Sequence, residues 1–281
     1  MSGFSADWLA LREPADRRAR NPRIAQALAE RFGDDGRTAV VDLGCGSGSN
    51  LRALAPLLAP EQDWRLVDHD PGLLAAARDR ISHWADEARP DGDGLLVRKG
   101  DRRLSVAFLQ ADLAGEWDRV LSETPDLVTA AALFDLVSAA WIERFAGEVA
   151  ARRIAVAAFL TYDGEERWEP PHPEDSAILD AFHRHQGTDK GFGVSAGPRA
   201  GLLLAEALRA RGYEVREGAS PWRLAAAQDA PLVAELALGI VQAVRETGLV
   251  AEPGLSSWLD ARVSGASCVV GHTDLLAVPP A

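Results

Sequence analysis

The sequence predicts an α/β fold in which a mostly parallel, doubly wound sheet carries helices on both faces. An apolar run at residues 38–43 passes directly into glycines at alternate positions, and a helical stripe follows at residues 51–58. Further apolar runs typical of buried strands alternate with helical stripes along most of the chain. Acidic residues, Asp68 and Asp112, directly follow two of these predicted strands. Alternating strands and helices of this kind are typical of a parallel sheet built from βαβ units.

Composition limits the classes of function. The chain has 281 residues and a formal net charge of −12, which disfavours a nucleic-acid partner because binding to phosphates requires clustered basic residues. No apolar run reaches 18 residues, so no membrane span is expected. The polar N-terminus lacks the apolar core of a signal peptide. The two cysteines, Cys45 and Cys268, fit no pairing pattern, which predicts reduced thiols and a cytoplasmic protein.

The segment before the central part of the chain, residues 1–37, is predicted to form a helical lid. Asn21 followed by Pro22 is a typical helix start, because the side chain of the first caps the helix and the second suits its first turn. Residues 38–162 then form the expected core of the fold. The strands predicted there cover residues 38–43, 64–67, 95–100, 103–110, 125–131 and 153–162.

Residues 163–197 are expected to form a cap inserted after the last core strand. A turn is predicted at residues 163–166, a proline-rich stretch follows, and residues 176–185 have the pattern of a helix. Long irregular connections in compact domains often carry function. His183 and His185 stand two positions apart and point to different sides of a helix, so no metal site is predicted.

Residues 198–281 are predicted to complete the sheet with a hairpin. Strands are expected at residues 213–217, 222–225 and 267–278, and helices at residues 200–211, 232–246 and 255–263. Two of these helices, 232–246 and 255–263, fall between the hairpin strands.

The glycine turn distinguishes two classes of ligand. Its pattern is G-x-G-x-G, and Ser49 stands where a dinucleotide fingerprint has its third glycine. Asp42, two residues before the first glycine, suits a cationic ligand better than a pyrophosphate. A NAD- or FAD-dependent oxidoreductase therefore remains as the less favoured alternative.

The stretches D-L-G-C-G-S-G, from Asp42 to Gly48, and V-D-H-D-P-G-L-L, from Val67 to Leu74, resemble the class I S-adenosylmethionine-dependent methyltransferases. The resemblance implies a seven-stranded sheet with a C-terminal antiparallel hairpin, in which residues 38–162 bind the methyl donor and residues 163–197 cap the acceptor. It also implies S-adenosyl-L-methionine as donor and S-adenosyl-L-homocysteine as product. The donor-binding residues that it implies are Asp42, Gly44, Cys45, Gly46, Ser47, Asn50, Asp68, His69, Asp112, Leu113 and Ala130.

Two of these acidic positions have structural alternatives. Asp68 is expected at the ribose, and Asp70 competes with it, although Asp70 also suits a helix cap. Asp112 is expected near the adenine amino group, or alternatively caps a turn.

The candidate catalytic residues are Asp135, Tyr162 and His172. Asp135 follows the central strand and either caps a helix or faces the acceptor as a base. The tetrapeptide Asn/Asp-Pro-Pro-Tyr/Phe and a Pro-Cys nucleophile are both absent after that strand, which disfavours methylation of nucleobases. The expected activity is methyl transfer to a small molecule of unspecified identity and acceptor atom. An inactive methyltransferase-like module that binds a ligand or partner is the second alternative.

Overall fold

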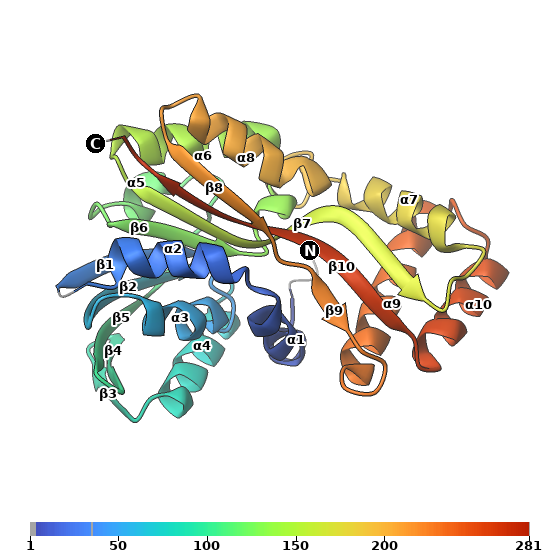
Figure 1. Cartoon of the computed structure of the whole chain (residues 1–281), viewed down its shortest axis with the longest axis horizontal. Helices are drawn as coiled ribbons and strands as arrows, with labels where there is room; N and C mark the ends of the chain where they lie inside the picture. The colour runs from blue at the N-terminus through green and yellow to red at the C-terminus, as the bar shows by residue number, and fades with distance from the viewer. Residues whose placement is uncertain (1–3, 35, 281) are drawn as a thin grey trace.

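The structure is a computed structural model that describes residues 4–34 and 36–280. Parts of the predicted lid and hairpin segment, residues 1–3, 35 and 281, lie outside this description. Within it, ten strands form one sheet (Figure 1). They are β1 Arg37–Leu43, β2 Glu61–Asp68, β3 Glu87–Asp91, β4 Gly94–Lys99, β5 Arg102–Gln110, β6 Leu127–Ala131, β7 Ala155–Glu169, β8 Glu214–Ala219, β9 Trp222–Leu224 and β10 Ser267–Val278.

The strand order is β3-β4-β5-β2-β1-β6-β7-β10-β8, and β9 also pairs with β10. The five central strands, β5, β2, β1, β6 and β7, are parallel. Strand β10 runs antiparallel between β7 and β8, so the predicted C-terminal hairpin is confirmed. The predicted α/β fold class is confirmed as well.

The sheet is wider than the seven strands that the resemblance implied. Strands β4 and β9 match short strands predicted at residues 95–100 and 222–225, whereas β3 was not predicted. The five residues of β3 are all exposed and include Pro90, so they show none of the apolar alternation that signals a strand. Strand β3 forms because the turn after Asp91 folds it back onto β4 at the edge of the sheet, where proline is tolerated.

Helices cover both faces of the sheet (Figure 1). One apolar core lies under α2, α3 and α4, and another lies under α5, α6 and α8. The bounds of these helices are α2 Pro22–Phe32, α3 Ser49–Leu54, α4 Pro71–Trp84, α5 Trp117–Val120, α6 Ala139–Ala151 and α8 Ala200–Arg209.

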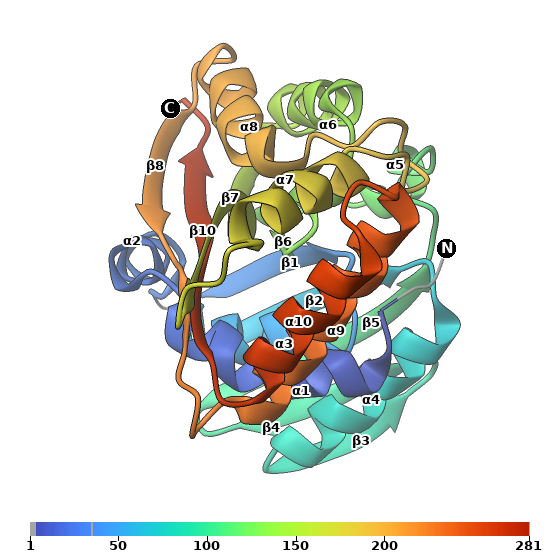
Figure 2. The same ribbon diagram turned by 90° about the vertical axis from the view of Figure 1, so that its right-hand side faces the viewer.

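A third apolar core surrounds the outer halves of β7 and β10. It is built with the helices α1 Ala6–Ala19, α7 Asp175–Gln186, α9 Ala230–Thr247 and α10 Glu252–Val263. Figure 2 shows α9 and α10 in front of the sheet. In Figure 1, α1 lies between this lobe and the strands of the first half.

The predicted turn at residues 163–166 is wrong, because β7 continues without interruption to Glu169. Glu166 pairs with Val270, and Glu169 pairs with Ser267. The partner strand lies about a hundred residues later in the chain, so the local polar pattern gave no sign of the pairing. The segment expected as a cap therefore begins as a strand that extends the sheet beyond its parallel part.

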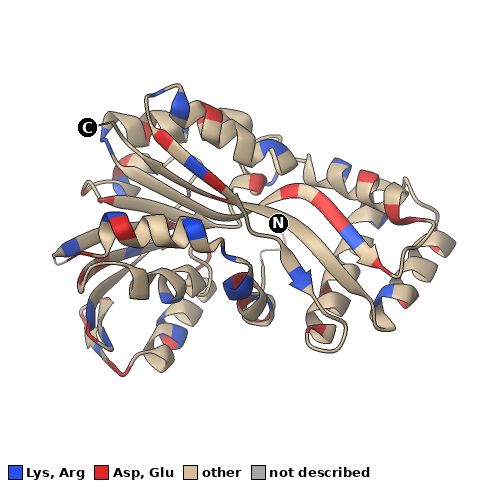
Figure 3. Ribbon diagram, viewed as in Figure 1, with Lys and Arg blue, Asp and Glu red and all other residues tan. Residues whose placement is uncertain are grey.

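Charged residues lie on the helices, on β8 and on the outer half of β7, whereas β6 and residues 155–162 of β7 carry no charge (Figure 3). Among the described residues, no helix combines the length and the apolar character required to cross a bilayer.

Candidate functional site

The glycine turn joins β1 to α3 in a conformation that requires glycine. Gly44, Gly46 and Gly48 have φ angles of 61°, 52° and 76°, in the left-handed region that L side chains rarely adopt. A Cβ added to Gly46 would lie 2.8 Å from Leu9 Cδ1. Helix α1 therefore packs directly on the bare main chain of the turn.

Asp42 and Asn50 form the floor beneath this turn. The Asn50 amide donates to Asp42 Oδ1 at 2.8 Å and to Thr129 Oγ1 at 3.1 Å. Arg20, at the end of α1, donates to Asn50 Oδ1 at 2.8 Å. Burial raises the pKa of the Asp42 carboxyl to about 7, and its Oδ2 has no hydrogen-bond partner among the described residues. This unpaired oxygen leaves capacity for a ligand that donates hydrogen bonds or carries positive charge.

Asp68 ties the end of β2 to the glycine turn. Its Oδ2 accepts the Gly46 N–H at 2.9 Å, and its Oδ1 accepts the Asp70 N–H at 3.0 Å. Asp70 instead caps α4, where its Oδ1 accepts the N–H groups of Gly72 and Leu73. Of the two predicted competitors, Asp68 thus lies against the turn and Asp70 has the structural role. His69 is exposed beside Asp68, with its Nδ1 3.3 Å from Asp68 Oδ1.

The remaining predicted donor residues lie at the same edge of the sheet. Asp112 follows β5 and accepts the Ala114 N–H at 2.8 Å, which is a turn contact. The buried Leu113 accepts from the Trp141 indole at 2.7 Å through its carbonyl. Ala130 pairs with Leu43 across β1 and β6. Cys45 and Ser47 are buried within the turn, where burial raises the pKa of the Cys45 thiol.

The structure brings two of the three predicted catalytic residues together. Asp135 lies in the short 3-10 helix Phe134–Leu136 after β6, and Tyr162 lies in β7. Burial raises the pKa of Asp135 to about 6, while the Tyr162 backbone N–H and the charge of Arg12 act in the opposite direction. Asp135 Oδ1 has no hydrogen-bond partner within residues 4–34 and 36–280.

The Tyr162 hydroxyl is held by two polar side chains. It donates to Glu166 Oε1 at 3.2 Å and lies 2.9 Å from His183 Nε2. Burial is the main reason that the pKa of Tyr162 is raised, and the nearby Glu166 adds to it. Burial likewise raises the pKa of Glu166 to about 7. Tyr162 therefore remains a neutral phenol at physiological pH.

Comparisons with known proteins agree with this arrangement. A putative methyltransferase from Bacillus halodurans superposes with a TM-score of 0.51 over 93% of this chain and 100% of its own, at 14% identity. A cyclopropane-fatty-acyl-phospholipid synthase-like protein from Lactobacillus casei superposes with a TM-score of 0.52 over 92% of this chain and 90% of its own, at 16% identity. The chain has the class I methyltransferase fold.

The sequence match covers a much smaller part of the chain than the structural superpositions do. The chain is 34% identical over 95 residues to the biotin biosynthesis bifunctional protein BioCD of Bordetella avium. This match covers 33% of the chain and spans only a fifth of that relative's length. No family model matches the sequence.

Within the methyltransferase fold, His172 lies away from the other two predicted catalytic residues. It follows the outer end of β7, which is seven residues or roughly 20 Å of strand beyond Tyr162. There its Nε2 is 3.2 Å from Ser257 Oγ, and its Nδ1 accepts the Glu174 N–H at 3.2 Å. These contacts connect a loop to α10, and a catalytic role for His172 remains a prediction without geometric support.

Sequence reasoning missed three side chains that the fold brings near Tyr162, namely Arg12, His183 and His272. His272 pairs with Tyr162 across β7 and β10, and their rings are 6.2 Å apart. His183, which no sequence pattern placed near Tyr162, has its Nε2 2.9 Å from the Tyr162 hydroxyl. Arg12, in α1, is largely buried. The register of β7 with β10 and the position of α1 decide these contacts, and neither has a local signal.

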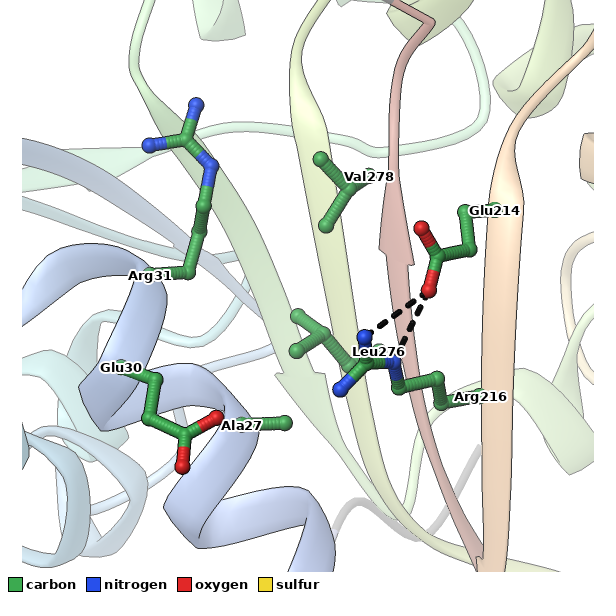
Figure 4. Close-up of a pocket in the computed structure, with 7 residues that line it drawn as sticks. All are labelled: Ala27, Glu30, Arg31, Glu214, Arg216, Leu276 and Val278. Atoms are coloured by element: carbon green, nitrogen blue, oxygen red, sulfur yellow. Dashed lines mark hydrogen bonds and ion pairs between the residues drawn. The ribbon is translucent and has the colours of Figure 1, made fainter.

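Two surface hollows lie at the opposite edge of the sheet. One is bordered by α2, β8 and β10, and Figure 4 shows its lining side chains, which include Arg31, Glu214 and Arg216. The other includes Arg37 and Ala155, the first residues of β1 and β7. Ligands of open parallel sheets bind at the carboxyl ends of the strands, so neither hollow corresponds to the glycine-turn site. Among the described residues, no group of three His, Cys, Asp or Glu side chains is arranged to hold a metal ion.

Proposed function

We propose that this chain binds S-adenosyl-L-methionine at the glycine turn and transfers its methyl group to a small molecule. The observation that carries the proposal is the turn itself. Three glycines in left-handed conformations expose the main chain, and Asp68 is anchored beside them at the end of the neighbouring strand. In sheets of this kind the acidic residue at the end of the second strand accepts hydrogen bonds from a ribose.

The polar groups under the turn fit a cationic donor better than a dinucleotide. Asp42 is buried with an unpaired oxygen, and the buried Ser47 hydroxyl also has no partner among the described residues. A carboxylate at this place stabilises positive charge and repels a pyrophosphate. Ser49 also removes the third glycine of the dinucleotide pattern, which disfavours the NAD- or FAD-dependent alternative.

The donor supplies a methyl group that is already activated by its positive sulfur. The work of the chain is therefore mainly positional, because holding the acceptor in line with the carbon–sulfur bond removes much of the entropic barrier. Asp135 follows β6, and Tyr162 lies in β7 just beyond the part of that strand that pairs with β6, where an acceptor would meet the methyl group. We assign Asp135 as the group that takes the acceptor's proton and Tyr162 as a group that orients the acceptor.

Several features favour a small, soluble acceptor in the cytoplasm. The net charge of −12 opposes nucleic acids, and the two free cysteines are buried and unpaired with each other. An inactive binding module remains the second candidate, because the methyltransferase fold alone does not establish activity.

The donor proposal is tested by titrating S-adenosylhomocysteine calorimetrically into the wild-type chain and the Gly46→Val variant. We expect binding to the wild type. The variant should lose it, because valine at a φ of 52° is strained and its side chain fills the space next to Leu9. The exposed Gly100, which also has a positive φ but open space around it, gives the control Gly100→Val for backbone strain alone. Absence of binding to the folded wild-type chain would overturn the proposal.

A further inference from the structure

Two buried polar atoms without partners belong to residues near Tyr162. Asp135 Oδ1 and His272 Nδ1 find no hydrogen-bond partner in the part of the chain that the structure describes. Asp135 is close enough to Tyr162 for the Tyr162 backbone N–H to stabilise its ionised form. His272 faces Tyr162 across the strand pair. Buried polar atoms are nearly always satisfied in folded proteins, so two unsatisfied ones near the same side chain indicate a ligand.

This cluster adjoins the glycine turn through the same face of α1. Leu9 packs on Gly46, and Arg12, which is three residues later, lies on the same side of the helix. The charge of Arg12 lowers the pKa of both Asp135 and His272, so Arg12 lies near both. On the other side, a Cβ on Gly44 would lie 3.2 Å from Leu133, two residues before Asp135. A methyl group presented from the turn would therefore face this cluster.

The net charge of the cluster is negative, because Arg12 and Asp16 cancel each other and Asp135 adds a negative charge. Arg12 is neutralised by Asp16, which accepts hydrogen bonds from its Nε and Nη2 and also from the Trp222 indole at 2.9 Å. Burial and Arg12 lower the pKa of His272 to about 3, so its ring is neutral. Asp135 forms no salt bridge with a cationic side chain among the described residues.

Aromatic rings supply the remaining walls of the cluster. Trp222 lies 5.2 Å from the His272 ring and also carries the Arg12 guanidinium at 4.8 Å from its centre. The rings of Tyr162 and His272 are 6.2 Å apart, and Phe182 lies 6.4 Å from Tyr162. Aromatic faces attract cations, and a buried carboxylate among them adds to this preference.

We propose that Asp135, Tyr162 and His272 bind the methyl acceptor as a small amine. This inference rests on the proposed methyl transfer at the glycine turn and specifies its substrate class. The N–H groups of an amine would satisfy Asp135 Oδ1 and the neutral His272 Nδ1, whereas a carboxylate would be repelled by Asp135. The amine arrives as an ammonium ion, and transfer of one proton to Asp135 frees the lone pair on nitrogen.

In the transfer step, the nitrogen lone pair forms the new nitrogen–carbon bond while the carbon–sulfur bond breaks. The electron pair of that bond stays on sulfur, which becomes a neutral thioether. The nitrogen acquires a positive charge, so the product leaves as the methylated ammonium ion, and Asp135 returns the first proton to solvent. Burial destabilises the Asp135 anion, which makes Asp135 a stronger base than an exposed carboxylate.

The inference is tested by calorimetric binding of matched probes to the full chain, with and without S-adenosylhomocysteine. The probes are 2-phenylethylamine, ethanolamine and propylamine, each compared with the carboxylate of similar size. We expect at least one amine to bind and its matched carboxylate not to bind. Asp135→Asn should weaken amine binding by about 10- to 100-fold, since a hydrogen bond to a charged group contributes roughly 1.5–3 kcal/mol.

The matched control is Asp118→Asn, which removes a fully exposed carboxylate and should leave amine binding unchanged. Retained binding of S-adenosylhomocysteine by Asp135→Asn shows that this variant folds. Equal or tighter binding of the carboxylates, no binding of any amine, or unchanged amine affinity in Asp135→Asn would each overturn the inference. Failure of S-adenosylhomocysteine to bind the wild type would instead overturn the donor proposal, because amine binding is also measured without it.

Discussion

At the residue scale, burial couples the ionisation of Asp42 to folding. Its carboxyl is fully buried, and its pKa is raised to about 7 from an ordinary value of 3.8. A raised pKa means that the folded chain holds a proton that the unfolded chain releases. The contribution of this proton to the free energy of unfolding is fully present below about pH 4 and is lost as the pH rises through about 7. Asp135 and Glu166, with pKa values of about 6 and about 7, act in the same direction.

We therefore predict that Asp42→Asn reduces the fall in melting temperature between pH 5 and pH 8. The fall should become smaller without vanishing, because Asp135 and Glu166 still release their protons. The measurement is thermal unfolding by circular dichroism across this range. The exposed Asp118→Asn variant is the control and should follow the wild type. Identical pH profiles of Asp42→Asn and wild type would contradict the prediction.

The raised pKa of Asp135 leads to a second prediction about pH. If it accepts the proton of the acceptor, kcat/KM should rise with pH through about 6 and then level off. Asp135→Asn should lower the rate by about 10²–10⁴-fold and remove this rise. The assay is transfer of a labelled methyl group to small molecules of a cell extract. A variant that retains the rise at pH 6 would show that another group titrates.

At the element scale, α1 connects the donor turn to the C-terminal half of the sheet. Glu13 pairs with Arg52 of α3 at 2.5 Å, and Arg18 pairs with Asp229 at 2.5 Å. Leu9 covers Gly46 and Arg20 donates to Asn50. The N-terminal lid at residues 1–37 remains a prediction.

The Glu13–Arg52 pair gives a prediction about how much the contact between α1 and α3 contributes to the free energy of unfolding. The Arg52 side chain is only 5% exposed, so Glu13→Gln leaves its charge buried without a counterion. Removing one partner of a buried pair costs about 3–5 kcal/mol of unfolding free energy. Urea unfolding should show this loss. Arg17, which is 62% exposed and also pairs with Glu13, provides the control Arg17→Gln with a cost of at most about 1 kcal/mol.

At the scale of the whole molecule, a donor bound between α1 and the sheet should stabilise the folded chain as a unit. S-adenosylhomocysteine at 100 times its Kd adds about 2.7 kcal/mol. For a chain of this size, that corresponds to a rise in melting temperature of roughly 5–10 °C. Differential scanning fluorimetry measures the shift, with NADH at the same concentration as the control. A shift with NADH alone would favour the dinucleotide alternative.

Much of the architecture was predictable from the sequence because its signals are local. Asn21 and Asp70 cap α2 and α4, since each side chain accepts the N–H groups two and three residues later. The glycine turn could be recognised because only glycine suits its backbone, and Asp68 could be placed because it ends an apolar strand. The width of the sheet was not predictable, because β3 has no apolar pattern and depends on its neighbour.

The sequence by itself determined the α/β class, the glycine turn and the acidic residues at the strand ends. These follow from periodicity and from the backbone requirements of single residues, which act over a few positions. Only the tertiary structure decided that Tyr162 meets Asp135, His183 and His272, that His172 lies elsewhere, and that α1 packs over Gly46. Those contacts depend on the pairing of strands β7 and β10 and on burial between distant segments. No local pattern encodes such a pairing, because its free energy exists only once both segments are folded.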